Sequence, residues 1–249
     1  IYDPAGIEMS VGENKINSRT YYARLTKSMV AAITAPMTEM SLFQVDMRLR
    51  PSGNQGPVAT SWEAFKHYQT SEAWVWEHLA LVNATIITGP EGLKADISEF
   101  CKSLKTLRPD EKVMSGLSIM RKRLLASRSM DEKWSLKLGQ GKLQDIELVS
   151  QMGILLSNEN ISGVHSGLTN LHKLKKICAE DLNYLINTYE LLLSVQILSK
   201  LLLKEDIKDR ELGANGKDLL FKYTDTSSIP SLIEKIAEMT SKSATIISN

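Results

Sequence analysis

The hydrophobic and polar positions follow different periods in the two parts of this 249-residue chain. Up to about Thr88 the pattern mixes helix and strand periods, whereas from Gly89 onward most apolar residues recur at the spacing of amphipathic helices. We therefore place a domain boundary near Gly89-Pro90. The pattern predicts an α+β portion over residues 1–88, followed by a helical linker and a helical bundle over residues 89–249.

The first portion contains predicted helices and strands. A helical period runs from Asn17 to Thr34, before Pro36 ends it. Ser41 to Arg50 alternates apolar and polar residues and predicts a half-buried strand, and Leu81 to Thr88 is rich in β-branched residues and predicts another. Thr60-Ser61-Trp62-Glu63 matches a capping box and predicts a helix that carries Phe65 to Gln69. The apolar face of the first helix consists of Tyr21, Leu25, Met29 and Ala32.

The second portion carries a series of apolar stripes at helical spacing. Each stripe needs a partner surface, which antiparallel helices joined by short loops supply. Ser228 followed by Ile229-Pro230 predicts the capped start of a last helix. The stripes run through Leu93, Ile97, Phe100, Leu104 and Leu107; Val113, Leu117, Met120 and Leu124; Leu143, Ile146, Val149 and Leu156; and Leu182, Leu185, Ile186, Tyr189 and Leu193.

Composition excludes several classes of protein. Thirty Lys and Arg residues nearly balance 29 Asp and Glu, and a net charge of +1 gives no field to hold nucleic acid or an anionic membrane. The two cysteines, Cys101 and Cys178, lack the spacing of a zinc site and fit a reducing compartment. No apolar run of membrane-spanning length and no secretory signal occurs, so we predict a cytoplasmic protein with neither a nucleic-acid nor a membrane partner.

The strongest candidate for chemistry is the segment from Val45 to Gly53. In the predicted strand, Asp46, Arg48 and Arg50 share one face and lead into the turn Ser52-Gly53. Reactions of nucleoside triphosphates use carboxylate oxygens for magnesium, and cations or backbone amides for the phosphates. The alternative is that these charges only face water on an edge strand.

The longer pattern around this segment resembles a known family. Its parts are Asp46-Met47-Arg48-Leu49-Arg50-Pro51-Ser52-Gly53, Glu72-Ala73-Trp74 with Trp76-Glu77-His78, Leu136-Lys137-Leu138-Gly139-Gln140-Gly141, and Asp145-Ile146-Glu147. Together they resemble the glutamate-ammonia-ligase adenylyltransferase family, and more closely its C-terminal, adenylylating half. The resemblance spans most of residues 1–150.

This resemblance implies a DNA polymerase beta-like nucleotidyltransferase domain followed by an α-helical bundle. It implies that Asp46 is the third metal carboxylate, with the first pair just upstream of Ile1, so the metal site in this chain is incomplete. The implied reaction transfers AMP from ATP, with Mg²⁺, to a tyrosine of glutamine synthetase. Arg48, Arg50 and the turn Ser52-Gly53 then position phosphates or support the site.

Other residues of the pattern have weaker implied roles. Lys137 is a candidate to reach a phosphate, and the alternative is an ordinary surface lysine. Asp145 and Glu147 are candidates to support the metal site from behind its ligands, although residues two apart on a helix point to different faces. Trp74 and Trp76 are predicted to be buried anchors rather than a platform for nucleotide bases.

Two other functions stay open beside AMP transfer. One is a non-catalytic remnant or regulatory module that binds glutamine synthetase or a PII-type nitrogen-signalling protein through its helices. The other is the deadenylylating half of the same family, which removes AMP by phosphorolysis and shares the Asp-x-Arg-x-Arg-Pro pattern around Asp46.

Overall fold

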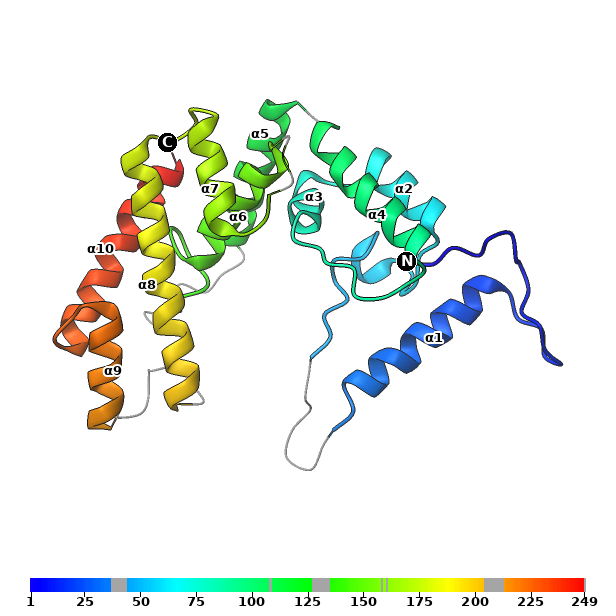
Figure 1. Ribbon diagram of the computed structural model, residues 1–249, viewed down its shortest axis with the longest axis horizontal. Helices are drawn as coiled ribbons and strands as arrows, with labels where there is room; N and C mark the ends of the chain where they lie inside the picture. The colour runs from blue at the N-terminus through cyan, green and yellow to red at the C-terminus, as the bar shows by residue number, and fades with distance from the viewer. Residues whose placement is uncertain are drawn as a thin grey trace. The chain divides into compact units, whose positions relative to one another are not determined.

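The chain folds as two compact helical units. The computed structural model describes residues 1–36, 44–107, 109–126, 135–157, 159, 161–203 and 213–248. Contacts divide the chain into Ile1–Leu107 and Arg108–Asn249 (Figure 1). The predicted domain boundary at Gly89-Pro90 stays a prediction, and the residues that follow it up to Leu107 pack within the first unit.

The first unit begins with the predicted helix after Asn17, which is confirmed. The Asn17 side chain accepts a hydrogen bond from the Thr20 amide at 2.8 Å and so caps the helix. Its predicted apolar face is nevertheless exposed, since Tyr21, Leu25 and Met29 expose between 43% and 50% of their surface. The elements of this unit are α1 (Ser18–Ile33), η1 (Gly53–Gln55), α2 (Trp62–Ser71), α3 (Val75–Leu81), α4 (Glu91–Ser103) and η2 (Leu104–Thr106).

An aromatic cluster joins α2 to α4. Phe100 of α4 meets Trp62 and Phe65 of α2 edge-on, with ring centroids 5.4 Å and 6.1 Å apart. Helix α2 starts one residue later than a cap at Thr60 predicts, because the Ser61 hydroxyl accepts the Ala64 amide. The prediction that Trp74 is a buried anchor is wrong, as 57% of its surface is exposed.

The prediction of an α+β fold with a DNA polymerase beta-like nucleotidyltransferase domain is wrong. The described residues form helices and turns, and their only β pairing is at isolated bridges. Of the strand predicted over Ser41–Arg50, residues 41–43 lie outside the described residues and the rest form an irregular segment and a turn. Of the strand predicted over Leu81–Thr88, Leu81 ends α3, Val82 and Asn83 form a turn, and the rest is irregular. A β-rich composition forms a strand only beside a partner strand.

The second unit contains the longer helices. They are α5 (Asp110–Ala126), α6 (Leu143–Leu155), α7 (Val164–Lys173), α8 (Ala179–Leu203), α9 (Ala214–Thr224) and α10 (Ile229–Ser248). Figure 1 shows α8 alongside α7, α9 and α10, which all contact it. The Ser228 hydroxyl accepts the Ser231 amide, which confirms the predicted capped start of α10.

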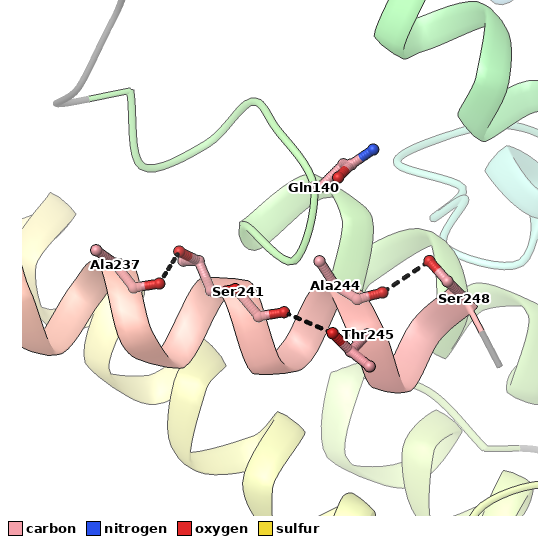
Figure 2. Close-up of a pocket in the computed structure, with 7 residues that line it drawn as sticks. Gln140, Ala237, Ser241, Ala244, Thr245 and Ser248 are labelled. Atoms are coloured by element: carbon pink, nitrogen blue, oxygen red, sulfur yellow. Dashed lines mark hydrogen bonds between the residues drawn. The ribbon is translucent and has the colours of Figure 1, made fainter.

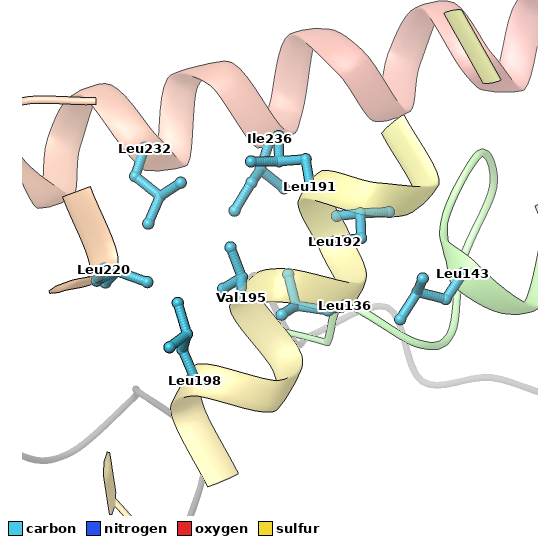
Figure 3. Packing of buried hydrophobic residues seen from close by; sticks show 9 residues of the cluster. All are labelled: Leu136, Leu143, Leu191, Leu192, Val195, Leu198, Leu220, Leu232 and Ile236. Atoms are coloured by element: carbon cyan, nitrogen blue, oxygen red, sulfur yellow. The ribbon is translucent and has the colours of Figure 1, made fainter. Parts of the chain in front are cut away.

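Leucine side chains from α8, α9 and α10 fill the core of this unit. Leu192 and Val195 of α8 are fully buried, as is Leu232 of α10. Figure 3 shows these side chains converging between the helices. The cluster consists of Leu136, Leu143, Leu191, Leu192, Val195, Leu198, Leu220, Leu232 and Ile236.

Helices α6 and α7 touch through their backbones. A Cβ atom on Gly153 would lie 2.1 Å from the Gly167 carbonyl oxygen, and one on Gly167 would lie 2.3 Å from that of Ser150. The Asn170 amide donates to the Gly153 carbonyl at 2.9 Å, which satisfies both groups inside the contact. Close backbone packing and this hydrogen bond therefore stabilise the α6–α7 pair in addition to apolar burial.

Helix α8 is long and apolar enough, by length and composition alone, to cross a membrane. Its window from Ala179 to Leu202 has a mean hydropathy of 1.2, and 33% of that window is buried inside the structure. It packs on α6, α7, α9 and α10, and the central helix of a helical unit passes the same test.

Candidate functional site

The Asp46 carboxylate lies on an exposed turn instead of a strand. Its oxygens accept hydrogen bonds from the Arg48 amide at 2.9 Å and from the Arg48 guanidinium at 2.6–3.0 Å. Arg48 holds the pKa of Asp46 at about 2 through these hydrogen bonds. The two side chains expose 57% and 76% of their surface, so the pair opens at little cost.

The Arg50 side chain stabilises the same turn through hydrogen bonds to its backbone. Its guanidinium donates to the carbonyl oxygens of Met47 at 2.5 Å, Asn54 at 3.1 Å and Gly56 at 3.1 Å. A planar guanidinium has several donors in a fixed fork, which suits several acceptors at once. These bonds commit Arg50 to the backbone of the turn, whereas the Arg48 guanidinium donates to the Asp46 carboxylate.

The turn has a tightly constrained backbone at Ser52, Gly53 and Gly56. Ser52 and Gly53 adopt left-handed conformations, with φ of 59° and 53°. A side chain on Gly56 would place its Cβ 1.9 Å from the Pro51 carbonyl oxygen, so this position accepts only glycine. The segment from Asp46 to Gly56 is therefore a shaped loop that presents one exposed carboxylate and one exposed guanidinium.

The other predicted site residues lie in the second unit. Lys137 is exposed and precedes α6, where its carbonyl accepts the Gln144 amide at 3.0 Å. Glu147 is half-buried on α6, and burial raises its pKa against the opposing effects of the Lys137 charge and a hydrogen bond from Tyr189. The structure thus groups Lys137, Glu147 and Tyr189 within this unit.

Asp145 is committed to a buried ion pair. The Arg121 guanidinium of α5 donates to its two oxygens at 2.6 Å and 3.0 Å, and the Gly141 amide donates at 2.8 Å. Arg121 also donates to the Ile247 carbonyl in the last turn of α10, at 3.1 Å. The ion pair therefore ties α5, the start of α6 and the end of α10 together.

The turn before α6 packs closely on α10. Gly141 has φ of 64°, and a Cβ there would lie 2.0 Å from the Thr240 carbonyl oxygen. Beside this contact is an open groove of 550 Å³. Figure 2 shows it lined by Gln140 and by small residues of α10, where the hydroxyls of Thr245 and Ser248 donate to carbonyls of their own helix. These polar groups are satisfied inside α10.

Comparison with known proteins identifies the family. The family model described as glutamate-ammonia ligase adenylyltransferase matches residues 1–100. The bifunctional glutamine synthetase adenylyltransferase/adenylyl-removing enzyme of Rhizobium meliloti (strain 1021) is 32% identical over 247 residues, which cover 95% of this chain and 25% of the relative. The chain belongs to the glutamate-ammonia ligase adenylyltransferase family.

Other members of the glutamate-ammonia ligase adenylyltransferase family match regions of different length. The enzyme of the same name from Mesorhizobium japonicum is 40% identical over 157 residues, which cover 62% of this chain and 16% of the relative. That from Rhodopseudomonas palustris (strain CGA009) is 29% identical over 245 residues, which cover 96% and 25%. The chain spans about a quarter of the length of these relatives, or less.

The Asp46 carboxylate gives the loop the type of oxygen ligand that binds magnesium. Its exposed carboxylate oxygens are the hard ligands that magnesium prefers, and magnesium on a nucleotide commonly takes one or two protein carboxylates beside phosphates and water. Within the described part of the chain, no three His, Cys, Asp or Glu side chains gather closely enough to hold a metal by themselves.

The contacts of Arg121, Tyr68 and Glu77 were not predicted from the sequence. Arg121 lies beside an apolar stripe, but its partner is 24 positions away, which no local pattern reveals. Tyr68 lies in the helix predicted over Phe65 to Gln69, and Glu77 belongs to the family pattern; in the structure the Tyr68 hydroxyl donates to the Glu77 carboxylate at 2.8 Å. A tyrosine hydroxyl beside a buried carboxylate is a signal that only the folded chain provides.

Proposed function

We propose that this chain is part of an enzyme that transfers AMP from ATP to a tyrosine of glutamine synthetase. The observation that carries the proposal is the 32% identity that extends over 95% of the chain to a relative with this named activity. The exposed loop from Asp46 to Gly56 adds support, because it presents groups that suit a metal–triphosphate complex.

In this proposal Asp46 and Arg48 act on the nucleotide. Asp46 would hold magnesium, which neutralises phosphate charge when bound. Arg48 would leave the Asp46 carboxylate and pair with a phosphate, because an exposed ion pair exchanges partners at little cost. The Ser52-Gly53 turn would position the same phosphates, while Arg50 keeps the turn in shape through its carbonyl contacts.

The residues of the second unit have different proposed roles. Lys137 would meet a phosphate as a mobile charge, since its side chain is exposed. Glu147 would orient Lys137, whose charge already acts on it. Asp145 would stabilise the fold of the second unit, because its carboxylate oxygens accept hydrogen bonds from Arg121 and Gly141.

Removal of AMP is the second candidate. The relatives carry the name adenylyl-removing enzyme beside adenylyltransferase, and the chain matches about a quarter of their length or less. The partner in either direction would be glutamine synthetase in the cytoplasm, with a PII-type nitrogen-signalling protein as a regulator. A binding module without catalysis is the third candidate.

A chimeric enzyme tests the proposal. This chain would replace the 25% of the Rhizobium meliloti enzyme that it matches, and label would be followed from ATP to glutamine synthetase. We expect transfer by the chimera, and a loss of at least about a hundredfold in rate with Asp46→Asn. Asp96→Asn, at an exposed position of α4, is the matched control and should leave the rate unchanged.

The direction of the reaction is read in the same chimera. Release of label from adenylylated glutamine synthetase with phosphate, and loss of that release with Asp46→Asn, would favour removal instead. A chimera that folds but performs neither reaction, or one that is indifferent to Asp46→Asn, would contradict a catalytic role for this loop.

A further inference from the structure

Helix α1 carries a row of large apolar side chains that the described residues leave uncovered. None of its 16 residues is buried, although the helix is capped by Asn17. An isolated helix of about this length is only marginally stable in water, because most helical stability in proteins comes from packing of an apolar face. The row consists of Tyr21, Leu25, Met29 and Ile33, which expose between 43% and 50% of their surface.

The row continues into a hollow at the start of α1. This hollow has a volume of 300 Å³, and Tyr21 and Tyr22 of α1 line it. The Tyr22 ring is fixed from behind, because it stacks on the ring of Tyr2 with centroids 4.2 Å apart. The hollow is also lined by exposed apolar side chains of the preceding segment, which are Ile7, Met9 and Val11. The row and the hollow form one exposed apolar surface, here called the α1 face.

Cations border the α1 face. Helix α1 contains Arg19, Arg24 and Lys27 and no acidic residue. At about 100° per residue, Arg19 and Arg24 lie on the two sides of the apolar row, whereas Lys27 lies on the opposite side of the helix. A partner that fits this surface therefore presents apolar side chains bordered by carboxylates.

Two candidate partners fit the α1 face less well. A second copy of this chain would bring the cations of one α1 next to those of the other, and like charges in an interface oppose association. A transient partner such as glutamine synthetase fits less well because transient interfaces are, on the whole, no more apolar than ordinary surface. Permanent interfaces resemble a core cut in half, and the α1 face is of this kind.

The relatives contain enough further chain to supply a permanent cover. The match with the Rhizobium meliloti enzyme includes α1 and takes up only 25% of that relative. Most of such an enzyme therefore lies outside the matched region. A segment of the same polypeptide also docks at a high effective concentration, so it covers an apolar face more readily than a separate molecule does.

We propose that the α1 face is a docking surface for another part of the same adenylyltransferase polypeptide, outside the region that this chain matches. The docked part presents apolar side chains to the row and carboxylates to Arg19 and Arg24. This inference rests on membership of the family and is independent of the proposed transfer of AMP.

Thiol labelling tests the docking without any nucleotide. Leu25→Cys and Met29→Cys each place a thiol in the row, and Ala31→Cys places one at an exposed position of α1 outside it. Each variant would be treated with a maleimide in this chain alone and in the chimera with the Rhizobium meliloti enzyme, and mass spectrometry of peptides would follow the new thiol. We expect labelling in the row to be at least about a hundredfold slower in the chimera, with Ala31→Cys unchanged.

Charge reversal tests the carboxylate border. Protection is the ratio of the labelling rate in this chain alone to that in the chimera, so an effect of a new charge on the thiol itself cancels. Arg24→Glu, combined with Leu25→Cys, should lower this protection by about tenfold, because a carboxylate would then face carboxylates. Lys27→Glu, on the opposite side of α1, is the matched control and should leave the protection unchanged.

Several results would overturn the proposal. Fast labelling of Leu25→Cys in the chimera would show that the α1 face is uncovered there. Slow labelling in this chain alone would place the cover within the chain, or in a second copy if the rate falls as protein concentration rises. Labelling of the chimera that slows only when glutamine synthetase or anionic phospholipid vesicles are added would identify an external partner instead. Protection that Arg24→Glu leaves intact would contradict the carboxylate border.

Discussion

Removal of the Asp145 carboxylate should destabilise the second unit strongly. The side chains of Arg121 and Asp145 expose only 13% and 9% of their surface. Asp145→Ala would leave the Arg121 guanidinium buried without its charge partner and the Gly141 amide without an acceptor. Breaking a buried pair from one side costs about 3–5 kcal/mol, a large share of the roughly 5–15 kcal/mol that stabilises a domain.

Urea denaturation followed by far-UV circular dichroism measures this cost. Faster hydrogen exchange of the α6 amides in Asp145→Ala would show that the second unit is the one destabilised. Asp145→Asn keeps an oxygen for the Gly141 amide and should cost less than Asp145→Ala. Asp218→Ala, at an exposed position of α9, is the matched control and should change the unfolding free energy by less than about 0.5 kcal/mol.

The single variants Arg121→Met and Asp145→Leu, together with the double variant that combines them, form a double-mutant cycle. Replacing both charges by apolar groups leaves no buried charge unpaired, so the double variant should be more stable than either single variant. A cost below about 1 kcal/mol for Asp145→Ala would refute the reasoning. So would additive costs of the two single changes, because they would show that the two charges are not coupled.

Three further changes test other parts of the structure. Arg48→Ala should return the pKa of Asp46 from about 2 toward its ordinary 3.8, measured by NMR titration of the carboxyl carbon; a value that stays near 2 would show that Arg48 is not the cause. Burial raises the pKa of Glu147, so the folded state binds its proton more tightly and stability falls as pH rises from 4.5 through that raised pKa. Glu147→Gln should remove this loss from urea midpoints measured across that pH range, and an unchanged pH dependence would contradict it. Leu185→Ala, at a fully buried position of α8, should cost about 2–5 kcal/mol in urea denaturation, and a negligible cost would mean that the site is not packed.

Periodicity in the sequence located several helices but not the partners of their apolar faces. The period through Tyr21, Leu25 and Met29 predicted α1 correctly, yet these side chains are exposed in the first unit. The same kind of period predicted that Leu185 would be buried, and it is. A stripe shows that a helix has an apolar face, whereas burial depends on the elements around it.

The predicted strand failed because side chains near Asp46 compete for the backbone. The alternation of apolar and polar residues from Ser41 to Arg50 fits an extended chain. In the structure, however, the Asp46 carboxylate accepts a hydrogen bond from the Arg48 amide, and the Arg50 guanidinium donates to carbonyls of the following turn. Local hydrogen bonds of this kind are invisible to a count of apolar positions. The sequence did place Asp46, Arg48 and the turn at Ser52 in one short segment, and they lie together in one loop.

The separation of Asp145 from Glu147 was partly foreseen. Two positions apart on a helix, they were expected to face differently, and Asp145 meets Arg121 while Glu147 meets Tyr189. The identity of each partner was not predictable, because the contacts join helices that are distant in sequence. The site roles of both residues stay predictions.

The close approach of α10 to the turn at Gly141 gives a rule for substitution along this helix. Thr240 and Ser243 are buried, and the backbone of Thr240 and Ala244 lies against Gly141, so larger side chains at Thr240 and Ser243 have no open space to enter. Ser241 is exposed on the same helix and has room for larger residues. A saturation library over α10 should therefore retain large side chains at exposed positions such as Ser241 and lose them at Thr240 and Ser243, with a period of about 3.6 residues.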